Sequence, residues 1–162
     1  EIMKKLLMLV AAVFALGGDF EDGVKAYESS NFVTAREKFA AACDANNGLA
    51  CAKLGALYQL GKDILPDTKK ALELYEKGCE LGSKEACSGA GGIYVSSDKE
   101  KARALLNKGC ELGDGFSCAT AGSYLLEEKK FKEAYALFEK ACKIGDSLGC
   151  QFASDLKRSK RL

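Results

Sequence analysis

Eight cysteines are the side chains in this 162-residue sequence with the clearest capacity for covalent chemistry. They form four pairs, each with seven residues between its members: Cys43/Cys51, Cys79/Cys87, Cys110/Cys118 and Cys142/Cys150. Thiols in such a set can form structural disulfides, bind zinc or carry out redox catalysis. The choice among these chemistries depends on the elements that carry the pairs.

Other catalytic chemistry has little support in the sequence. The chain has no histidine, which removes the commonest general base and the commonest metal ligand. Two Ser-x-x-Lys sequences, Ser96 to Lys99 and Ser154 to Lys157, match the motif of active-site serine β-lactamases. The companion Ser-Asp-Asn and Lys-Thr-Gly motifs are absent, and one match falls in a predicted loop and the other in the terminal helix. We therefore predict no catalytic residue, no metal and no cofactor, and we favour a protein that is not an enzyme.

The cysteine pairs recur every 31 to 36 residues, and other residues recur in phase with them. An alanine lies eight residues before the first cysteine of each pair, and a bulky residue lies four before it. The alanines are Ala35, Ala71, Ala102 and Ala134, and the bulky residues are Phe39, Tyr75, Leu106 and Phe138. Apolar residues at i, i+4 and i+8 share one face of a helix. Each repeat therefore contains a helix that ends near its first cysteine.

A glycine recurs four residues after the second cysteine of three pairs, at Gly55, Gly91 and Gly122, and Gly23 takes the same place in the first repeat. A glycine inside a helix costs about 1 kcal/mol relative to alanine. A recurrent one therefore indicates that another helix approaches closely. These glycines mark the first helix of each repeat, and the alanine-bearing helix is the second.

A period of this length is typical of stacked helical hairpins. We predict helices over 19–30, 33–45, 48–60, 67–81, 84–96, 98–112, 115–127, 131–144 and 147–158. Asp67, directly after the only proline, and Asp98 are the expected N-caps of two second helices. Between the members of three pairs lie links such as Gly113-Asp114, where one helix can end and the next can begin.

The helix map favours disulfides. Cysteines eight apart on one straight helix would be about 12 Å apart, beyond the roughly 7 Å Cα limit for a disulfide. A turn between them removes this obstacle, so each pair should link the second helix of one repeat to the first helix of the next. Zinc binding would require thiolates from different steps of the stack to converge, and redox sites usually have a tighter Cys-x-x-Cys spacing, so both remain less favoured alternatives.

The N-terminal segment has the order of a secretory signal: lysines at positions 4 and 5, an apolar run over 6–16 and then two glycines. The run is too short to cross a bilayer, and its alternative is a buried helix. We predict a signal peptide over 1–17 with cleavage near 17/18, a solenoid over 18–158 with four hairpins and a C-terminal capping helix, and a basic tail over 159–162. Export to the periplasm or the exterior agrees with oxidised cysteines.

The recurring residues resemble a known family. The segments Leu54 to Tyr58 and Lys70 to Gly82 resemble the Sel1-like repeat, a relative of the tetratricopeptide repeat (TPR). The added cysteine pairs resemble the Helicobacter cysteine-rich protein family, whose members also carry a penicillin-binding and weak β-lactamase label. The fold that this resemblance implies is all-α, a right-handed α/α solenoid of Sel1-like, TPR-like hairpins stapled by disulfides. Asp63 departs from the pattern, because the repeat usually has glycine there.

By analogy with TPR proteins, the first helices should form a concave wall that binds a peptide or a protein. The small residues at positions that should face it are Ala52, Ala56, Ser88, Gly92, Ala119 and Ser123, and we favour packing of helix against helix over close contact with a ligand backbone for them. The larger residues expected to face it are Leu49, Gln59, Glu85, Phe116, Leu126 and Glu127. Phe116 is the expected apolar anchor, with a place in the core as the equal alternative.

The balance of 24 basic and 23 acidic residues gives no strong field to attract nucleic acid or an anionic membrane. The terminal basic run is expected to be a solvated tail. We therefore expect a monomeric binding scaffold with an unidentified peptide, protein or cell-wall-derived ligand, and no membrane span once the signal is removed. The alternative that the resemblance implies is a penicillin-binding protein with weak β-lactamase activity.

Overall fold

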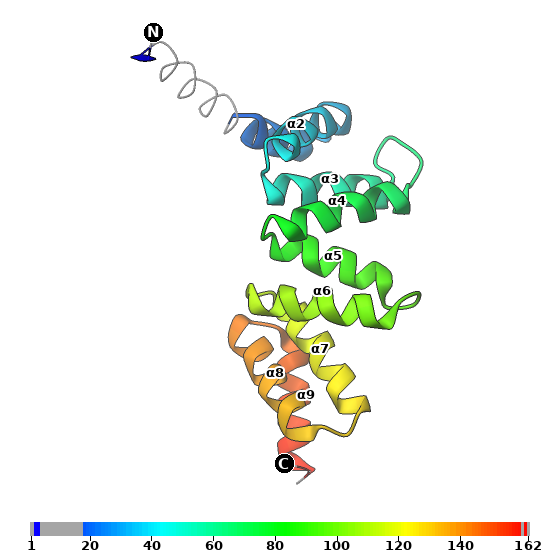
Figure 1. Cartoon of the computed structure of the whole chain (residues 1–162), viewed down its shortest axis with the longest axis vertical. Coiled ribbons are helices and arrows are strands. Elements are labelled where there is room, and N and C mark those ends of the chain that lie inside the picture. Colours follow the sequence, from blue (N-terminus) through cyan, green and yellow to red (C-terminus); the bar gives the residue numbers. More distant parts are fainter. Residues whose placement is uncertain (1, 4–17, 160, 162) are drawn as a thin grey trace. The chain divides into compact units, whose positions relative to one another are not determined.

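The computed structural model describes residues 2–3, 18–159 and 161, and within these residues the secondary structure is helical (Figure 1). The chain divides into two compact units at Leu81 and Gly82. The first unit contains a helix over residues 18–28, α2 (Phe32–Asp44), α3 (Gly48–Leu60) and α4 (Thr68–Glu80). The second contains α5 (Lys84–Tyr94), α6 (Lys99–Glu111), α7 (Gly115–Glu127), α8 (Phe131–Ile144) and α9 (Ser147–Arg158).

These helices confirm the predicted all-α fold. The bounds of α3, α7, α8 and α9 are those predicted. Each of the other helices differs from its predicted bounds by one or two residues at one end or at both ends. The two predicted caps are present: the side chain of Asp67 accepts a hydrogen bond from the backbone N–H of Lys70, and that of Asp98 from Lys101. The predicted signal peptide lies outside the described residues except for positions 2 and 3, and only residues 159 and 161 of the predicted tail are described.

Helices pair as hairpins within each unit. The most extensive contacts join α3 to α4 in the first unit, and α5 to α6 and α7 to α8 in the second. The predicted inward-facing residues of the second helices form the core, because all four repeat alanines are fully buried and the bulky residues in phase with them are at least 95% buried. The largest fully buried side chains are Phe39, Phe138, Leu57 and Leu106.

The recurrent glycines explain how the hairpins close. A Cβ atom added at Gly91 would lie 2.7 Å from the side chain of Leu106, and one added at Gly122 would lie 2.8 Å from the ring of Phe138. The same contact joins Gly23 to Phe39 at 2.7 Å and Gly55 to Tyr75 at 3.0 Å. In every repeat the first-helix glycine thus packs on the bulky residue of the second helix. The close approach that the sequence indicated is the contact that sets the spacing of each hairpin.

The connection after each second helix uses one local geometry. The third residue after the first cysteine of each pair has a left-handed backbone, with φ of 64° at Asn46, 85° at Gly82, 89° at Gly113 and 103° at Gly145. The next residue is an Asn, Ser or Asp whose side chain caps the following helix. A left-handed residue ends a helix readily when it is glycine or asparagine. The chain therefore reverses within two residues.

This short reversal brings the cysteines together. Disulfides join Cys43 to Cys51, Cys110 to Cys118 and Cys142 to Cys150, with Cα–Cα distances of 4.7, 4.5 and 4.4 Å. Cys79 and Cys87 are also disulfide-bonded. No described cysteine is free. Each of these three disulfides links the end of a second helix to the start of the next first helix, as the spacing predicted.

Candidate binding surface

The first helices lie next to one another in the second unit, where α5 contacts α7 and α7 contacts α9. This arrangement gives a row of first helices, which is the surface to which the sequence assigned partner binding. The predicted residues of α5 and α7 lie in this row, and those of α3 lie on the equivalent helix of the first unit.

The small residues predicted for this surface differ in exposure. Ala52 and Ala119 are only 4% and 6% exposed, so they pack inside the protein and offer almost no surface to a partner. Ala56, Ser88 and Ser123 are half-buried and Gly92 is exposed. The favoured packing role therefore applies to the two alanines, whereas Ser88, which also directly follows a buried cysteine, keeps part of its surface exposed.

The larger residues provide most of the accessible area. Gln59, Glu85, Phe116 and Glu127 are exposed, and Leu49 and Leu126 are half-buried. The three polar side chains have intramolecular partners: Gln59 accepts a hydrogen bond of 2.8 Å from the hydroxyl of Tyr75, Glu85 one of 3.1 Å from Ser83, and Glu127 pairs with Lys99. These contacts hold the polar side chains in fixed positions on the surface.

Phe116 is the large aromatic residue exposed on α7, with half of its surface open to solvent. It stands in the first turn of α7, two residues before the disulfide-bonded Cys118. Leu148 occupies the same repeat position in α9 and is 53% exposed. Leu148 was not predicted, although its place two residues before Cys150 is a signal that indicates it.

Two further apolar residues lie near the start of α7. Leu112 and Ile144, at the ends of α6 and α8, are 41% and 42% exposed. A Cβ atom on Gly115 would lie 3.6 Å from Ile144, so this side chain borders the first turn of α7. The second unit thus exposes apolar side chains at its helix junctions as well as on the row.

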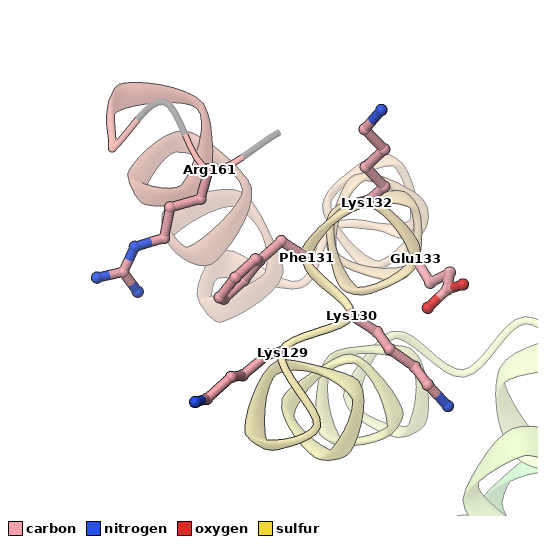
Figure 2. A pocket seen from close by; sticks show the side chains of 6 residues that line it. All are labelled: Lys129, Lys130, Phe131, Lys132, Glu133 and Arg161. Atoms are coloured by element: carbon pink, nitrogen blue, oxygen red, sulfur yellow. The ribbon is translucent and has the colours of Figure 1, made fainter.

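The end of the second unit contains two neighbouring hollows that the sequence did not predict. One, of about 320 Å³, is lined by Lys129, Lys130, Phe131, Lys132, Glu133 and Arg161 (Figure 2). The other, of about 240 Å³, is lined by Leu126, Phe152, Asp155, Leu156, Ser159 and Arg161. Arg161 borders both. Sequence reasoning assigned Arg161 to a solvated tail, and only the run Lys129 to Lys132 around an aromatic residue could have indicated the first hollow.

The two Ser-x-x-Lys sequences have no arrangement typical of a nucleophile and its base. Lys99 pairs with Glu127, and the hydrogen bond from this pair raises the pKa of the lysine. A catalytic lysine needs the opposite change, because it must lose its proton to act as a base. Ser154 and Lys157 are both exposed on α9.

No group of three or more cysteine, aspartate and glutamate side chains in the described ranges is placed to hold a metal ion. Among helices formed by described residues, none combines the length and the apolar character needed to cross a membrane.

Comparisons with known proteins place the repeat pattern in context. The family model of the Sel1 repeat matches residues 48–83, 87–114 and 122–146, which together are more than half of the chain. Cytochrome c oxidase assembly factor 7A of Xenopus laevis is 38% identical over 78 residues, which make up 48% of this chain and 34% of that protein. β-Lactamase HcpA of Helicobacter pylori is 36% identical over 51 residues, 32% of this chain and 20% of that protein. The chain spans about a third or less of the length of these relatives.

Solved structures share the fold. The protective antigen c5321 of uropathogenic Escherichia coli, described as an SLR fold, has a TM-score of 0.76 at 22% identity over 83% of this chain and 32% of that one. A Sel1 repeat protein of Oxalobacter formigenes also has a TM-score of 0.76 at 22% identity, over 80% of this chain and 57% of that one. The MamA protein has a TM-score of 0.55 at 20% identity, over 90% of this chain and 88% of that one.

Proposed function

The chain belongs to the Sel1 repeat family, and from this premise we propose that it is an exported, disulfide-linked scaffold that binds a peptide or protein partner on its first helices. Helical-repeat proteins commonly bind partners on the row of first helices, where neighbouring hairpins form one extended surface. The apolar signal-like segment and the oxidised cysteines support export, because disulfides persist in oxidising compartments.

The observation that carries this proposal is the exposed ring of Phe116 on a fixed element. The Cys110–Cys118 disulfide holds the first two turns of α7 against α6, so the ring is presented on a rigid base. Aromatic residues, phenylalanine among them, are enriched at protein interfaces relative to the rest of the surface. Leu126, half-buried on the same helix, and Glu127 provide an apolar and an acidic contact near its other end.

Peptide arrays probed with the full oxidised protein test this proposal. Peptides that bind the unaltered protein should bind Phe116→Ala about tenfold or more weakly, which is the loss expected for an aromatic anchor. Val95→Ala is the matched control, because Val95 is 45% exposed at the end of α5 and lies outside the predicted surface. Equal affinity of the Phe116 and Val95 variants for every captured peptide would contradict binding by the first helices.

β-Lactam hydrolysis is the second candidate, and it is favoured by the name of one relative, the β-lactamase HcpA, which covers 32% of this chain. A serine mechanism would use Ser96 or Ser154. Nitrocefin turnover by the full oxidised chain that is lost in Ser96→Ala or Ser154→Ala would support it. Turnover that is absent, or unchanged in both variants, would exclude the serine mechanism.

A further inference from the structure

The turn between α7 and α8 gathers positive charge in the second unit. Lys129, Lys130 and Lys132 lie within four residues, and Arg161 lies over the ring of Phe131 with 5.5 Å between its Cζ atom and the ring centroid. Figure 2 shows the charged ends of Arg161 and Lys129 on the same side of the ring, while Lys130, Lys132 and Glu133 point elsewhere. Two cations therefore lie on one side of a half-buried aromatic ring.

Lys129 and Lys130 directly precede α8, a place where positive side chains are unfavourable. A helix N-terminus carries partial positive charge and is stabilised by anionic or oxygen-bearing side chains. Helices α2 to α7 and α9 each begin with an Asn, Asp or Ser side chain that accepts a backbone hydrogen bond. Helix α8 has Lys130 in this place and no side-chain hydrogen bond. Its N-terminus is thus the one among α2 to α9 with cations in place of a cap.

Nearby carboxylates offset only part of this charge. Glu128 binds Lys130 with 2.7 Å between Oε2 and Nζ and also pairs with Arg103, and Glu133 lies in the first turn of α8. Within the described part of the chain, Lys129 and Lys132 have no carboxylate partner. The hollow therefore retains a local excess of positive charge, although the whole chain is nearly balanced with 24 basic and 23 acidic residues.

Apolar side chains also line the two hollows, next to these charged groups. Phe131, Leu126 and Phe152 pack against the buried cluster of the second unit, and Leu156 belongs to that cluster. Each hollow, at about 320 and 240 Å³, has room for one or two side chains. Asp155 also lines the second hollow, beside Arg161, and it pairs with Arg158 at 3.6 Å. The cationic side chains around the first hollow, next to these apolar walls, complement a ligand that carries negative charge beside an aromatic or aliphatic group.

We propose that the hollows around Arg161 bind an acidic peptide segment, with a carboxylate between Lys129 and Arg161 and a neighbouring apolar side chain against Phe131 or in the hollow of Leu126, Phe152 and Leu156. The near-neutral chain and the small size of the hollows favour a short acidic segment over a nucleic acid or a membrane surface, both of which require an extended basic face. The first hollow lies at the turn between α7 and α8, and the second is lined by Leu126 of α7 and by Phe152 and Leu156 of α9. The site shares Leu126 with the predicted first-helix surface, but it does not include Phe116 and does not require the proposed role of that ring.

A defined peptide tests the proposal with the full oxidised chain. The probe is a fluorescein-labelled Gly-Glu-Asp-Phe-Glu-Glu-Leu-Gly peptide, compared with the same peptide in which Gln and Asn replace the acids. Fluorescence anisotropy at low ionic strength should show binding of the acidic peptide only, and added salt should weaken it. The double variant Lys129→Glu/Arg161→Glu should weaken binding about tenfold or more, and Phe131→Ala should weaken it severalfold.

The matched control is Lys69→Glu/Lys108→Glu, which makes the same change in net charge at exposed lysines of α4 and α6. It should bind the peptide as the unaltered protein does, and thermal unfolding checks that every variant is folded. Equal weakening by both double variants would show a non-specific charge effect and overturn the proposal. So would equal binding of the uncharged peptide, or direct binding of inorganic phosphate or phosphatidylglycerol vesicles by a protein that does not bind the acidic peptide. Phe116→Ala should leave this affinity unchanged, which separates the site from the first-helix surface.

Discussion

Adding a single methyl group at each of two neighbouring glycines in α5 tests how closely the helices of a hairpin approach each other. Gly91→Ala should lower the free energy of unfolding by about 1–3 kcal/mol, because the new Cβ would lie 2.7 Å from Leu106 in a filled core. Gly92→Ala should leave stability unchanged or raise it by up to about 1 kcal/mol, because no atom lies within 4 Å of its Cβ position and alanine favours helix. Urea unfolding of both variants measures the difference. Equal effects at the two positions would contradict the packing role of Gly91.

Glu128 provides a test of pH dependence. Hydrogen bonds from Lys130 and Arg103 hold the pKa of this carboxyl below its usual value. A carboxyl whose pKa is lower in the folded state contributes stability above its unfolded pKa, and this contribution is lost as the pH falls through the folded pKa. The stability difference between the unaltered protein and Glu128→Gln should therefore shrink between about pH 7 and about pH 3. Urea midpoints at both values measure it, and the exposed Glu111→Gln is the control. A difference that grows on acidification would refute the assignment.

At the residue level, the sequence indicated which glycines approach another helix but not the full set of surface residues. Phase with the cysteines identified Gly55, Gly91 and Gly122, because a repeated residue must satisfy the same contact in each hairpin. The packing role favoured for the small residues is found at Ala52 and Ala119. The hollow around Arg161 was not predicted, because it depends on residues 131 and 161 meeting across a helix pair, and such a contact leaves no periodic signal.

Each disulfide should stabilise its junction through the ring that it closes. The Cys110–Cys118 bond closes a ring of nine residues, and the chain-entropy model assigns about 2.5 kcal/mol to a ring of this size. The double variant Cys110→Ala/Cys118→Ala should lower the free energy of unfolding by about this amount under oxidising conditions. The difference in free energy of unfolding between the two proteins should vanish when both are unfolded in the presence of a reductant. A loss that persists in reductant would show that packing of the two buried sulfur atoms, not ring closure, is responsible.

Element boundaries were predictable because local signals coincide at each junction. The cysteine spacing required a reversal, and glycine followed by an Asp or Ser cap showed where it occurs in three junctions. In the fourth junction, Asn46 has the left-handed backbone that glycine has in the other three. Asparagine adopts this conformation more readily than most residues. The shorter α5, which ends at Tyr94, was not predicted, because the following Val95, Ser96 and Ser97 carry no strong helix-ending residue.

The redox and export predictions are tested on the whole molecule. Protein isolated from its native source without reductant should resist thiol alkylation and should lack the mass of eight hydrogen atoms relative to the reduced chain. If the signal peptide is cleaved as predicted, the first residue of the mature protein should lie near position 18. Intact-mass spectrometry before and after reduction measures both. Alkylated cysteines in native material, or a retained N-terminal segment in an exported fraction, would contradict these predictions.

The two-residue reversals also determine how the protein responds to being cut. Gly113 and Asp114 are half-buried in the loop enclosed by the Cys110–Cys118 bond. A protease that cleaves the backbone there breaks the polypeptide but leaves both pieces attached through sulfur. Such a nicked protein would migrate as one species on a non-reducing gel and separate into two bands only after treatment with a thiol. Cleavage in the link between the paired helices α7 and α8, which no described disulfide encloses, would have no such protection.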